Sequence, residues 1–454
     1  MIYGFPGRTT EYLSSYSVDM IMNQSDPDRV KIREMRLKIM DGDMQKSDAV
    51  RIQYAAKYAG LANYWKKWEG EINGLKKLDA INKKREFEKK FIQKANESES
   101  AKTAYSKLFT DFEKEFTIMR PLNKQKDYFQ EALIGIELVN YLSTYYEVIE
   151  ALKSGKKAVD LQKQIDKLKT DLPVFYKDFH PATDEKICSA MLKMVSSDIP
   201  KEQQPGIIAE IEKKYNGKFS EYASKIYSHS IFTSQDATEE VLNKLEKSYK
   251  KILKDPIYQL MQSCYGKFVT EIRPKFNEED AKITALNRTY MKGMRELITD
   301  KKYYPDANST LRVAYGKVNG YYPKDGVFYN YYTTLEGIME KENPAVDEFV
   351  VSPRLKDLYV KKEYGNYADK NGELRVAFCA SNHTTGGNSG SPVFNGNLEL
   401  IGTNFDRNWE GTMSDIMYDP DQVRNIVLDV RYTLFVIDKY AGAGYLVKEM
   451  KIVK

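Results

Sequence analysis

The sequence predicts an α+β fold in which a large α-helical domain precedes a β domain, and changes in composition along the chain indicate this order. From about Val18 to Asp300, glycine is sparse and apolar residues recur at spacings of three and four, which is typical of amphipathic helices. From about Tyr304 onward, glycine, tyrosine and alternating β-branched residues take over, which indicates strands. The 454 residues exceed one ordinary core, so two or more domains are expected.

The helical region shows its periodicity in pairs such as Ile72 with Leu75 and Phe87 with Phe91. No fixed repeat period is present, which argues against a solenoid. We expect prolines to mark the turns between helices, because proline removes a backbone donor. The prolines concerned are Pro121, Pro173, Pro181, Pro200, Pro205, Pro256 and Pro274.

The β domain is predicted to contain early strands at residues 310–315 and 375–380, where β-branched residues alternate with others. Residues 424–430 alternate as a further strand, and residues 432–440 have the spacing of a helix. The chain is therefore expected to end on a strand followed by a closing helix.

A glycine-rich run from Thr384 to Val393, Thr-Thr-Gly-Gly-Asn-Ser-Gly-Ser-Pro-Val, holds Ser389 between glycines. Glycines permit the tight turn that exposes a nucleophilic hydroxyl, and they leave room for backbone amides to point at a developing oxyanion. The amides of Gly387 and Ser389 are the candidates for that oxyanion hole. An isolated Gly-x-Ser-Gly also fits an ordinary Gly/Ser-rich β-turn, so the segment that follows must decide between the two interpretations.

That following segment is predicted to be a β-hairpin, with strands at 392–394 and 398–402 and a turn at Asn395-Gly396. Such a hairpin typically follows the nucleophile in the second β-barrel of chymotrypsin-like peptidases. The context therefore favours Ser389 as a serine-peptidase nucleophile.

Longer motifs extend this context over nearly the whole chain. The stretches 383–392, 404–415 and 429–442 carry unusual sequences, among them Asn-Phe-Asp-Arg-Asn-Trp-Glu-Gly-Thr-Met-Ser-Asp. Near the other end, Gly-Phe-Pro-Gly-Arg-Thr at 4–9 and Ala-Asn-Tyr-Trp-Lys-Lys-Trp at 62–68 belong to the same set. Together these motifs resemble the dipeptidyl-peptidase 7/11 family of bacterial serine exopeptidases.

The resemblance implies three segments. Residues 1–16 would be the end of a first β-barrel and a linker, residues 17–303 an α-helical cap domain, and residues 304–454 the C-terminal chymotrypsin-like β-barrel with its closing helix. Family members carry their catalytic histidine and aspartate in the first barrel, ahead of the Gly-Phe-Pro-Gly-Arg-Thr motif. We therefore expect this chain to be a C-terminal part of such an enzyme, inactive until the missing N-terminal barrel completes it.

The same resemblance implies the substrate-binding residues. Asp406 matches the aspartate that binds the substrate's α-amine, and Asn63 in the cap matches a further amine ligand. An amine held at a fixed distance from the nucleophile limits release to dipeptides. Arg407 stands where Asp/Glu-specific members carry Arg and members that prefer a hydrophobic P1 residue carry Gly. Because a guanidinium pairs with a carboxylate through two parallel hydrogen bonds, the closest type is the Asp/Glu-specific dipeptidyl-peptidase 11.

The chain contains three histidines, His180, His229 and His383. His383 lies six residues before Ser389, but in a chymotrypsin-like barrel that stretch forms a pocket wall and the base comes from the other barrel. We therefore expect His383 to have a pocket-wall or hydrogen-bonded structural role. His180 and His229 are expected at helix ends or on the surface.

Composition excludes several other classes of protein. The net charge of +5 is the difference between 70 basic and 65 acidic residues, and these are interspersed, which gives little support for a nucleic-acid partner. The three cysteines are too few and too scattered for a disulfide framework or a metal cluster, and no cofactor is predicted. No apolar run of about 18 residues predicts a transmembrane helix, and the first residues do not form a signal peptide.

The partners implied by the resemblance are short peptides with a free N-terminus and an acidic P1 residue, together with a second copy in a homodimer. It also implies a periplasmic or cell-surface location for the intact enzyme. A non-catalytic alternative is a helical peptide-binding or scaffold protein in which Ser389 lies in an inert turn. A second alternative, a chymotrypsin-like endopeptidase, fits the cap and the Asp406 motif less well.

Overall fold

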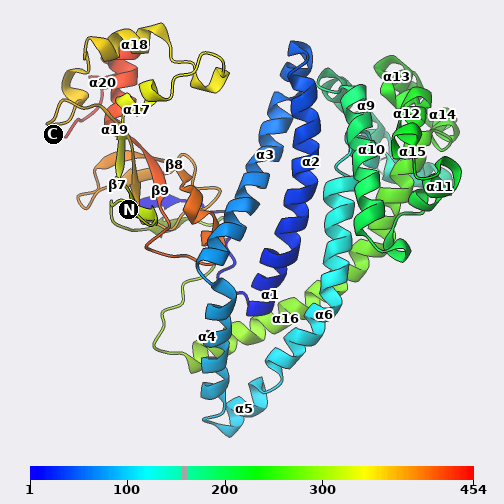
Figure 1. The fold of residues 1–454 in the computed structure, drawn as a ribbon, viewed down its shortest axis with the longest axis horizontal. Helices are drawn as coiled ribbons and strands as arrows, with labels where there is room; N and C mark the ends of the chain where they lie inside the picture. The colour runs from blue at the N-terminus through cyan, green and yellow to red at the C-terminus, as the bar shows by residue number, and fades with distance from the viewer. Residues whose placement is uncertain (156–160, 454) are drawn as a thin grey trace. The chain divides into compact units, whose positions relative to one another are not determined.

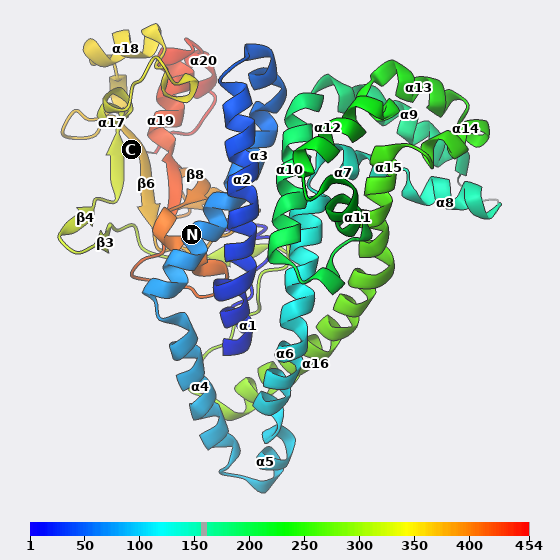
Figure 2. The ribbon, with the colours of Figure 1, turned by 45° about the vertical axis from the view of Figure 1, so that its right-hand side comes forward.

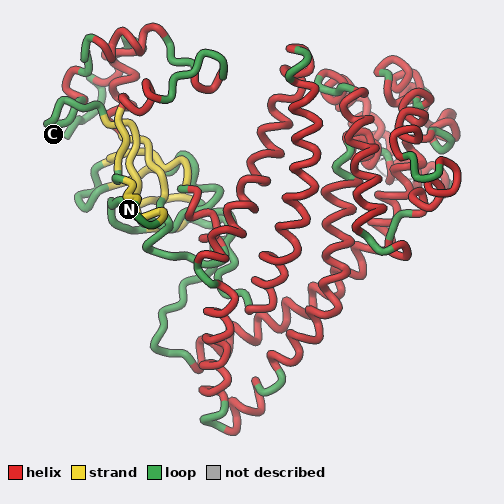
Figure 3. Tube along the Cα trace, viewed as in Figure 1, coloured by secondary structure: helices red, strands yellow, loops and turns green. Residues whose placement is uncertain are grey.

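The computed structural model describes residues 1–155 and 161–453, and the chain divides into two compact units. The sheet unit combines Met1–Leu13, Gly70–Lys84 and Thr299–Lys454. The helical unit comprises Ser14–Glu69 and Arg85–Ile298. The strands lie in the sheet unit, whereas the helical unit is built of helices and their connections (Figure 3). The predicted mixture of helix and sheet is therefore confirmed.

Amphipathic helices fill the helical unit, and two of them, α3 and α4, also supply the Gly70–Lys84 part of the sheet unit. The helices are α1 (Ser15–Met20), α2 (Asp26–Met44), α3 (Asp48–Lys77), α4 (Ala80–Ala95), α5 (Glu99–Tyr105), α6 (Leu108–Asp127), α7 (Glu137–Ser143), α8 (Tyr146–Ser154), α9 (Leu161–Lys177), α10 (Pro181–Asp198), α11 (Gly206–Tyr215), α12 (Phe219–His229), α13 (Gln235–Asn243), α14 (Leu245–Ile252), α15 (Pro256–Met261) and α16 (Arg273–Leu297).

Helices α6 and α16 run side by side in both views of the ribbon (Figure 1, Figure 2). Aromatic rings fasten α4 and α6 to α16, because Tyr290 contacts Phe91 and Phe112 at ring-centroid distances of 5.4 and 6.1 Å. Gly293 makes room for this packing, since a Cβ atom there would lie 2.5 Å from the ring of Phe91. The close approach therefore depends on a glycine near the C-terminal end of α16.

Prolines mark helix starts only in part. Pro181 and Pro256 stand in the first turns of α10 and α15, where no N–H is needed, as predicted. Pro121 and Pro173 instead lie inside α6 and α9, so the prediction that they mark turns was wrong. Both prolines are exposed, while Met119 and its apolar neighbours on the opposite face are buried. Burial of that face outweighs the one hydrogen bond that each proline removes.

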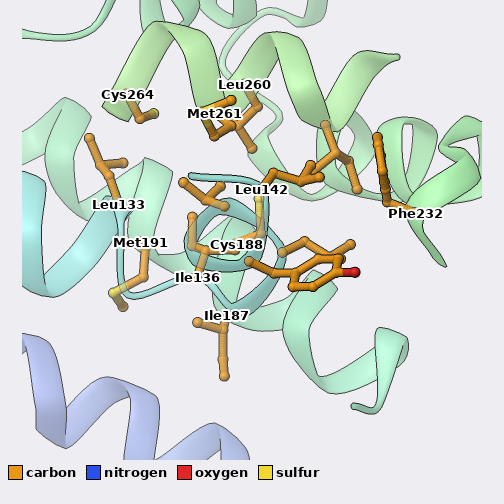
Figure 4. Packing of buried hydrophobic residues seen from close by; sticks show 14 of the residues in the cluster. Leu133, Ile136, Leu142, Ile187, Cys188, Met191, Phe232, Leu260, Met261 and Cys264 are labelled. Atoms are coloured by element: carbon orange, nitrogen blue, oxygen red, sulfur yellow. The ribbon is translucent and has the colours of Figure 1, made fainter. Parts of the chain in front are cut away.

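The core of the helical unit extends over most of its helices, from Ile32 to Ile272, and Figure 4 shows some of its packed side chains, among them residues of α7, α10 and α15. Cys188 and Cys264 are buried in it as free thiols. A polar contact also joins two of these helices. Ile136, which precedes α7, offers no side-chain cap, and Asp184 of α10 instead accepts the N–H groups of Glu137 and Leu138 at 2.7 and 3.0 Å. Helix α7 is therefore capped by a residue from a neighbouring helix.

The sheet unit contains a seven-stranded sheet with the order β2-β1-β7-β8-β9-β6-β5, in which the paired strands are antiparallel. Its core is formed by Ile2, Phe378, Val393 and Val427. A separate ribbon is formed by β3 and β4. The strands are β1 (Ile2–Gly4), β2 (Arg312–Ala314), β3 (Tyr321–Lys324), β4 (Val327–Tyr329), β5 (Tyr332–Thr334), β6 (Arg375–Ala380), β7 (Pro392–Phe394), β8 (Leu400–Arg407) and β9 (Asn425–Asp429).

The predicted hairpin and the predicted last strand are present. Strands β7 and β8 pair in an antiparallel manner, but the turn extends from Asn395 to Glu399, with Leu398 in a left-handed conformation at φ 63°. Strand β8 therefore begins two residues later than expected. Strand β9 runs into a helical segment made of α19 (Val430–Phe435) and a π-helical turn to Tyr440, as the spacing predicts. Short helices α17 (Leu335–Glu340), α18 (Pro353–Val360) and α20 (Gly444–Val447) complete the unit.

No helix in the described part of the chain is both long enough and apolar enough to span a membrane. Among residues 1–155 and 161–453, no cluster of histidine, cysteine and carboxylate side chains has the arrangement of a metal site.

Candidate active site

Ser389 lies on the loop that joins β6 to β7, and it is exposed. Its hydroxyl donates to the carbonyl oxygen of Phe405 at 3.2 Å. The residues after it are fixed to β8, because the N–H of Gly390 donates to the carbonyl of Asn404 at 2.8 Å and the N–H of Asn404 donates to that of Ser391 at 2.9 Å. The loop therefore presents a hydroxyl on a backbone that is held by the sheet.

Two glycines of this loop adopt conformations that other residues rarely adopt. Gly387 has a φ of 104° and Gly390 a φ of 84°. A Cβ atom on Gly387 would also lie 2.3 Å from the carbonyl oxygen of Phe5, and the N–H of Gly7 donates to Gly386 at 2.6 Å. The Gly-Phe-Pro-Gly motif near residue 5 is therefore packed against the loop that carries Ser389.

The backbone N–H groups of Gly387 and Ser389 donate to no residue that the structure describes. The N–H of Asn388, which lies between them, donates to Thr385, and that of Gly390 donates to Asn404. Two free donors that flank an exposed hydroxyl are what an oxyanion hole requires. The residues chosen from the sequence for this role therefore have amides that are available for it.

Buried asparagines support the loop that carries Ser389, and no motif in the sequence indicates them. Asn404 donates to the carbonyl of Asn388 at 3.1 Å, and its side-chain oxygen accepts from Asn425 at 2.9 Å. Asn425 in turn accepts from the N–H of Asn382 at 3.2 Å. These four side chains are at most 3% exposed. A pattern of asparagines spread over 44 positions gives no signal until the strands are paired.

A β-bulge shapes the end of β8. Asn404 pairs with Val427 but Asp406 pairs with Ile426, so Phe405 is the extra residue. Phe405 and Asp406 are both exposed, whereas Arg407 turns back into the protein with 13% of its side chain exposed. The carboxylate of Asp406 accepts from the N–H of Arg407 at 2.7 Å. The bulge thus accounts for two consecutive exposed side chains, and the ordinary alternation of the strand then turns Arg407 away from the side of Asp406.

Arg407 is held through one of its three nitrogens. Its Nη1 forms an ion pair with Asp415 at 2.8 Å, donates to the carbonyl of Thr384 at 3.2 Å, and contacts the hydroxyl of Ser414. Neither Nη2 nor Nε has a hydrogen-bond partner among the described residues. That edge of the guanidinium is the one that two oxygens of a carboxylate can bind.

His383 lies on the same β6–β7 loop as Ser389, and its side chain is mostly buried. Its ring stacks on Tyr418 with centroids 4.8 Å apart, and its Nδ1 lies 3.5 Å from a carboxylate oxygen of Glu11. Burial lowers the pKa of His383, and burial raises the pKa of Glu11 to about 7 although Tyr304 donates to that carboxylate. These residues line a cavity of about 340 Å³. Within residues 1–155 and 161–453, no imidazole is among the hydrogen-bond partners of Ser389.

The remaining candidates lie in the helical unit. Asn63 is an exposed residue of α3, and its role as an amine ligand stays a prediction. His180 precedes α10, and His229 is the last residue of α12, so both stand at helix ends as predicted.

Comparison with known proteins identifies the family. The model of the family Peptidase S46 matches residues 1–452. The chain belongs to the Peptidase S46 family. This S46 chain is 44% identical over 457 residues to the Asp/Glu-specific dipeptidyl-peptidase of Flavobacterium psychrophilum, and 37% identical over 459 residues to dipeptidyl-peptidase 7 of Phocaeicola vulgatus. The family resemblance inferred from the motifs is therefore confirmed.

A solved structure agrees with this assignment. The crystal structure of DPP11 from Porphyromonas endodontalis in complex with the dipeptide Arg-Glu matches the S46 chain with a TM-score of 0.86 and 32% sequence identity. The match covers 99% of this chain and 63% of that one. The matches to the two relatives cover 100% of this chain. They cover only 63% and 62% of the relatives' own lengths.

Proposed function

We propose that this chain forms the larger part of a serine exopeptidase that releases dipeptides from peptide N-termini, with a preference for Asp or Glu at P1. In this proposal Ser389 attacks the scissile carbonyl and becomes acylated. The amides of Gly387 and Ser389 stabilise the oxyanion. The sheet unit would then correspond to the second barrel of a chymotrypsin-like peptidase, and the helical unit to its cap.

The observation that carries the proposal is the exposed hydroxyl of Ser389 beside two backbone N–H groups that have no partner among the described residues. An exposed turn can leave such donors to water, so the support comes from their position on both sides of an exposed hydroxyl, which is the arrangement that an oxyanion hole needs. Membership of a peptidase family supports the same assignment.

Substrate choice is proposed from Arg407 and Asp406. The unpartnered edge of Arg407 suits a P1 carboxylate, and relatives named Asp/Glu-specific dipeptidyl-peptidases support an acidic preference. The exposed carboxylate of Asp406 suits the substrate's α-ammonium. Asn63 is proposed as a further amine ligand on the family resemblance alone. The structure of a relative bound to Arg-Glu supports a dipeptide-sized ligand.

The general base is proposed to lie outside these 454 residues, since Ser389 bonds to a main-chain carbonyl and to no imidazole in the described structure. A histidine and an aspartate in chymotrypsin-like order would supply it. We propose a periplasmic or cell-surface location on the family resemblance alone.

The test is made on the complete gene product with a fluorogenic dipeptidyl substrate that has Asp at P1. Ser389→Ala should reduce kcat by roughly four to six orders of magnitude, and a phosphonate that labels the wild type should no longer label this variant. Ser391→Ala is the matched control, because Ser391 lies two residues away and is buried beside Gly4. Labelling of Ser389→Ala, or activity above a few per cent of wild type, would contradict the assignment.

A further inference from the structure

The position of the Arg407 guanidinium is fixed by contacts with a neighbouring segment of the chain. The 3₁₀ helix Trp409–Asp415 begins two residues after Arg407 and folds back, so that Ser414 and Asp415 reach the Nη1 atom. Asp415 is only 12% exposed in its side chain, and Ser414 is fully buried. This ion pair is therefore largely shielded from water, which makes it stronger than a surface pair.

The segment that carries Asp415 is itself fixed. Asn408 accepts from the N–H of Arg424 at 2.8 Å and donates to the carbonyl of Gln422 at 2.8 Å, which ties the start of the 3₁₀ helix to the loop just before β9. Gly411 packs so closely on Asn408 that a Cβ atom there would lie 2.3 Å from the Asn408 side-chain oxygen. The backbone N–H of Thr10 donates to the carbonyl of Asp415 at 2.7 Å. Asp415 therefore holds a set position relative to the sheet.

We propose that Asp415 is a specificity-determining positioning residue, which anchors Nη1 of Arg407 so that the Nε–Nη2 edge is presented to an acidic P1 side chain. This inference rests on the proposed function, in which Arg407 binds the P1 carboxylate. Sequence position alone does not reveal the role, because Asp415 lies eight residues after the arginine that it orients.

Two physical effects follow from the anchor. An arginine side chain has several rotatable bonds, and Asp415 removes that freedom before the substrate arrives, so a P1 carboxylate meets a preorganised fork. Asp415 also balances the charge of Arg407 when the site is empty, since an unpaired charge at 13% exposure is costly. Anchoring and charge balance can be separated, because asparagine keeps an oxygen acceptor but not the charge.

The experiment compares kcat/KM for two dipeptidyl substrates, one with P1 Asp and one with P1 Leu, in the complete gene product. Asp415→Ala should lower the Asp-to-Leu ratio by about tenfold or more, mainly through a higher KM for the P1 Asp substrate. Asp415→Asn should keep this ratio at the wild-type value or raise it, because the acceptor remains and the charge of Arg407 is no longer balanced. Asp421→Ala is the matched control, since Asp421 is an exposed carboxylate six residues further on.

The outcomes separate this inference from the proposed function. A wild type that does not prefer P1 Asp contradicts the proposed function itself. If the wild type prefers P1 Asp and Asp415→Ala slows both substrates equally, Asp415 is only structural and the inference is overturned. A ratio that rises in Asp415→Ala overturns it as well, because Asp415 would then only weaken the charge of Arg407. The same ratio in Asp421→Ala as in wild type shows that the change is specific to Asp415.

Discussion

Arg407 is the residue on which substrate choice is expected to turn. In Arg407→Gly the P1 carboxylate loses its partner and meets the carboxylate of Asp415, which Arg407 no longer neutralises, so the preference should reverse toward P1 Leu. We expect the Asp-to-Leu ratio of kcat/KM to fall by roughly 100-fold or more, the scale of a lost charge-assisted pair. Paired fluorogenic substrates measure this ratio in the complete gene product. An unchanged ratio would leave Arg407 as a structural partner of Asp415.

Asp406 is expected to act on the other end of the dipeptide. Asp406→Asn should lower kcat/KM for substrates with a free N-terminus by roughly 30- to 1,000-fold, because the contact with the α-ammonium loses its charge. N-terminally acetylated substrates have no such charge and should already be poor in the wild type. Equal turnover of free and acetylated peptides by the wild type would contradict the exopeptidase proposal.

Glu11 links the stability of the sheet unit to pH. Burial raises its pKa from 4.5 to about 7, so the folded protein binds this proton more tightly than the unfolded chain does. The free energy of unfolding should therefore fall as the pH rises from about 4.5 to about 7, by at most about 3 kcal/mol from this group. Glu11→Gln should remove this part of the pH dependence in urea denaturation at pH 5 and pH 8. The exposed Glu363→Gln is the control, and an identical pH dependence in Glu11→Gln would refute the prediction.

At the level of single residues, the sequence allowed a prediction where a residue type is strongly associated with one conformation, as glycine is with tight turns. Glycines around Ser389 predicted a strained turn, and the structure has positive φ at Gly387 and Gly390. The supporting residues could not be predicted. Asn404 can bond to Asn388 and Asn425 only because strand pairing brings the three residues together. Asp415 can pair with Arg407 only because the chain folds back. Such contacts depend on pairing that no local pattern encodes.

Among the elements, helix α7 offers a direct test of stability. Asp184 is fully buried and accepts two N–H groups at the start of α7 as well as the hydroxyl of Tyr227 at 2.6 Å. Asp184→Ala leaves these donors buried without a partner, so the helical unit should lose roughly 3 kcal/mol or more of stability. Thermal and urea denaturation measure the loss. Glu185→Ala, the next residue on α10, should change stability by less than about 0.5 kcal/mol, and an equal loss in both variants would refute the cap.

Element types were predictable where the spacing of apolar residues was clear, as in the β7–β8 hairpin and in β9 with its closing helix. The residues at which helices and strands begin and end were harder to predict. Leu398 belongs to the turn because a left-handed residue closes it, and leucine gives no such signal. Pro173 lies inside α9 because tertiary packing of Leu168 and Leu172 overrides the local preference of proline.

For the molecule as a whole, we predict that these 454 residues alone hydrolyse no dipeptidyl substrate. A serine hydroxyl without an adjacent base is a weak nucleophile, and Ser389 has no imidazole partner in the described structure. Fluorogenic assays on the purified chain should stay at the background rate. Activity that disappears in His383→Ala would show instead that His383 serves as the base.

Strand β1 has a further consequence, which concerns the order in which the protein is made. Its partners in the sheet are Ala314 of β2 and Val393 of β7, so β1 leaves the ribosome long before either neighbour exists. At translation speeds of roughly 5–20 residues per second, about a quarter of a minute to a minute passes before β2 is complete. The residues of the helical unit emerge within that interval, because they lie between β1 and β2 in the sequence. Vectorial synthesis therefore favours helices that fold before the pairing of β1 with β2 and β7 is complete, so Ile2 joins Val393 in the apolar core only late in synthesis.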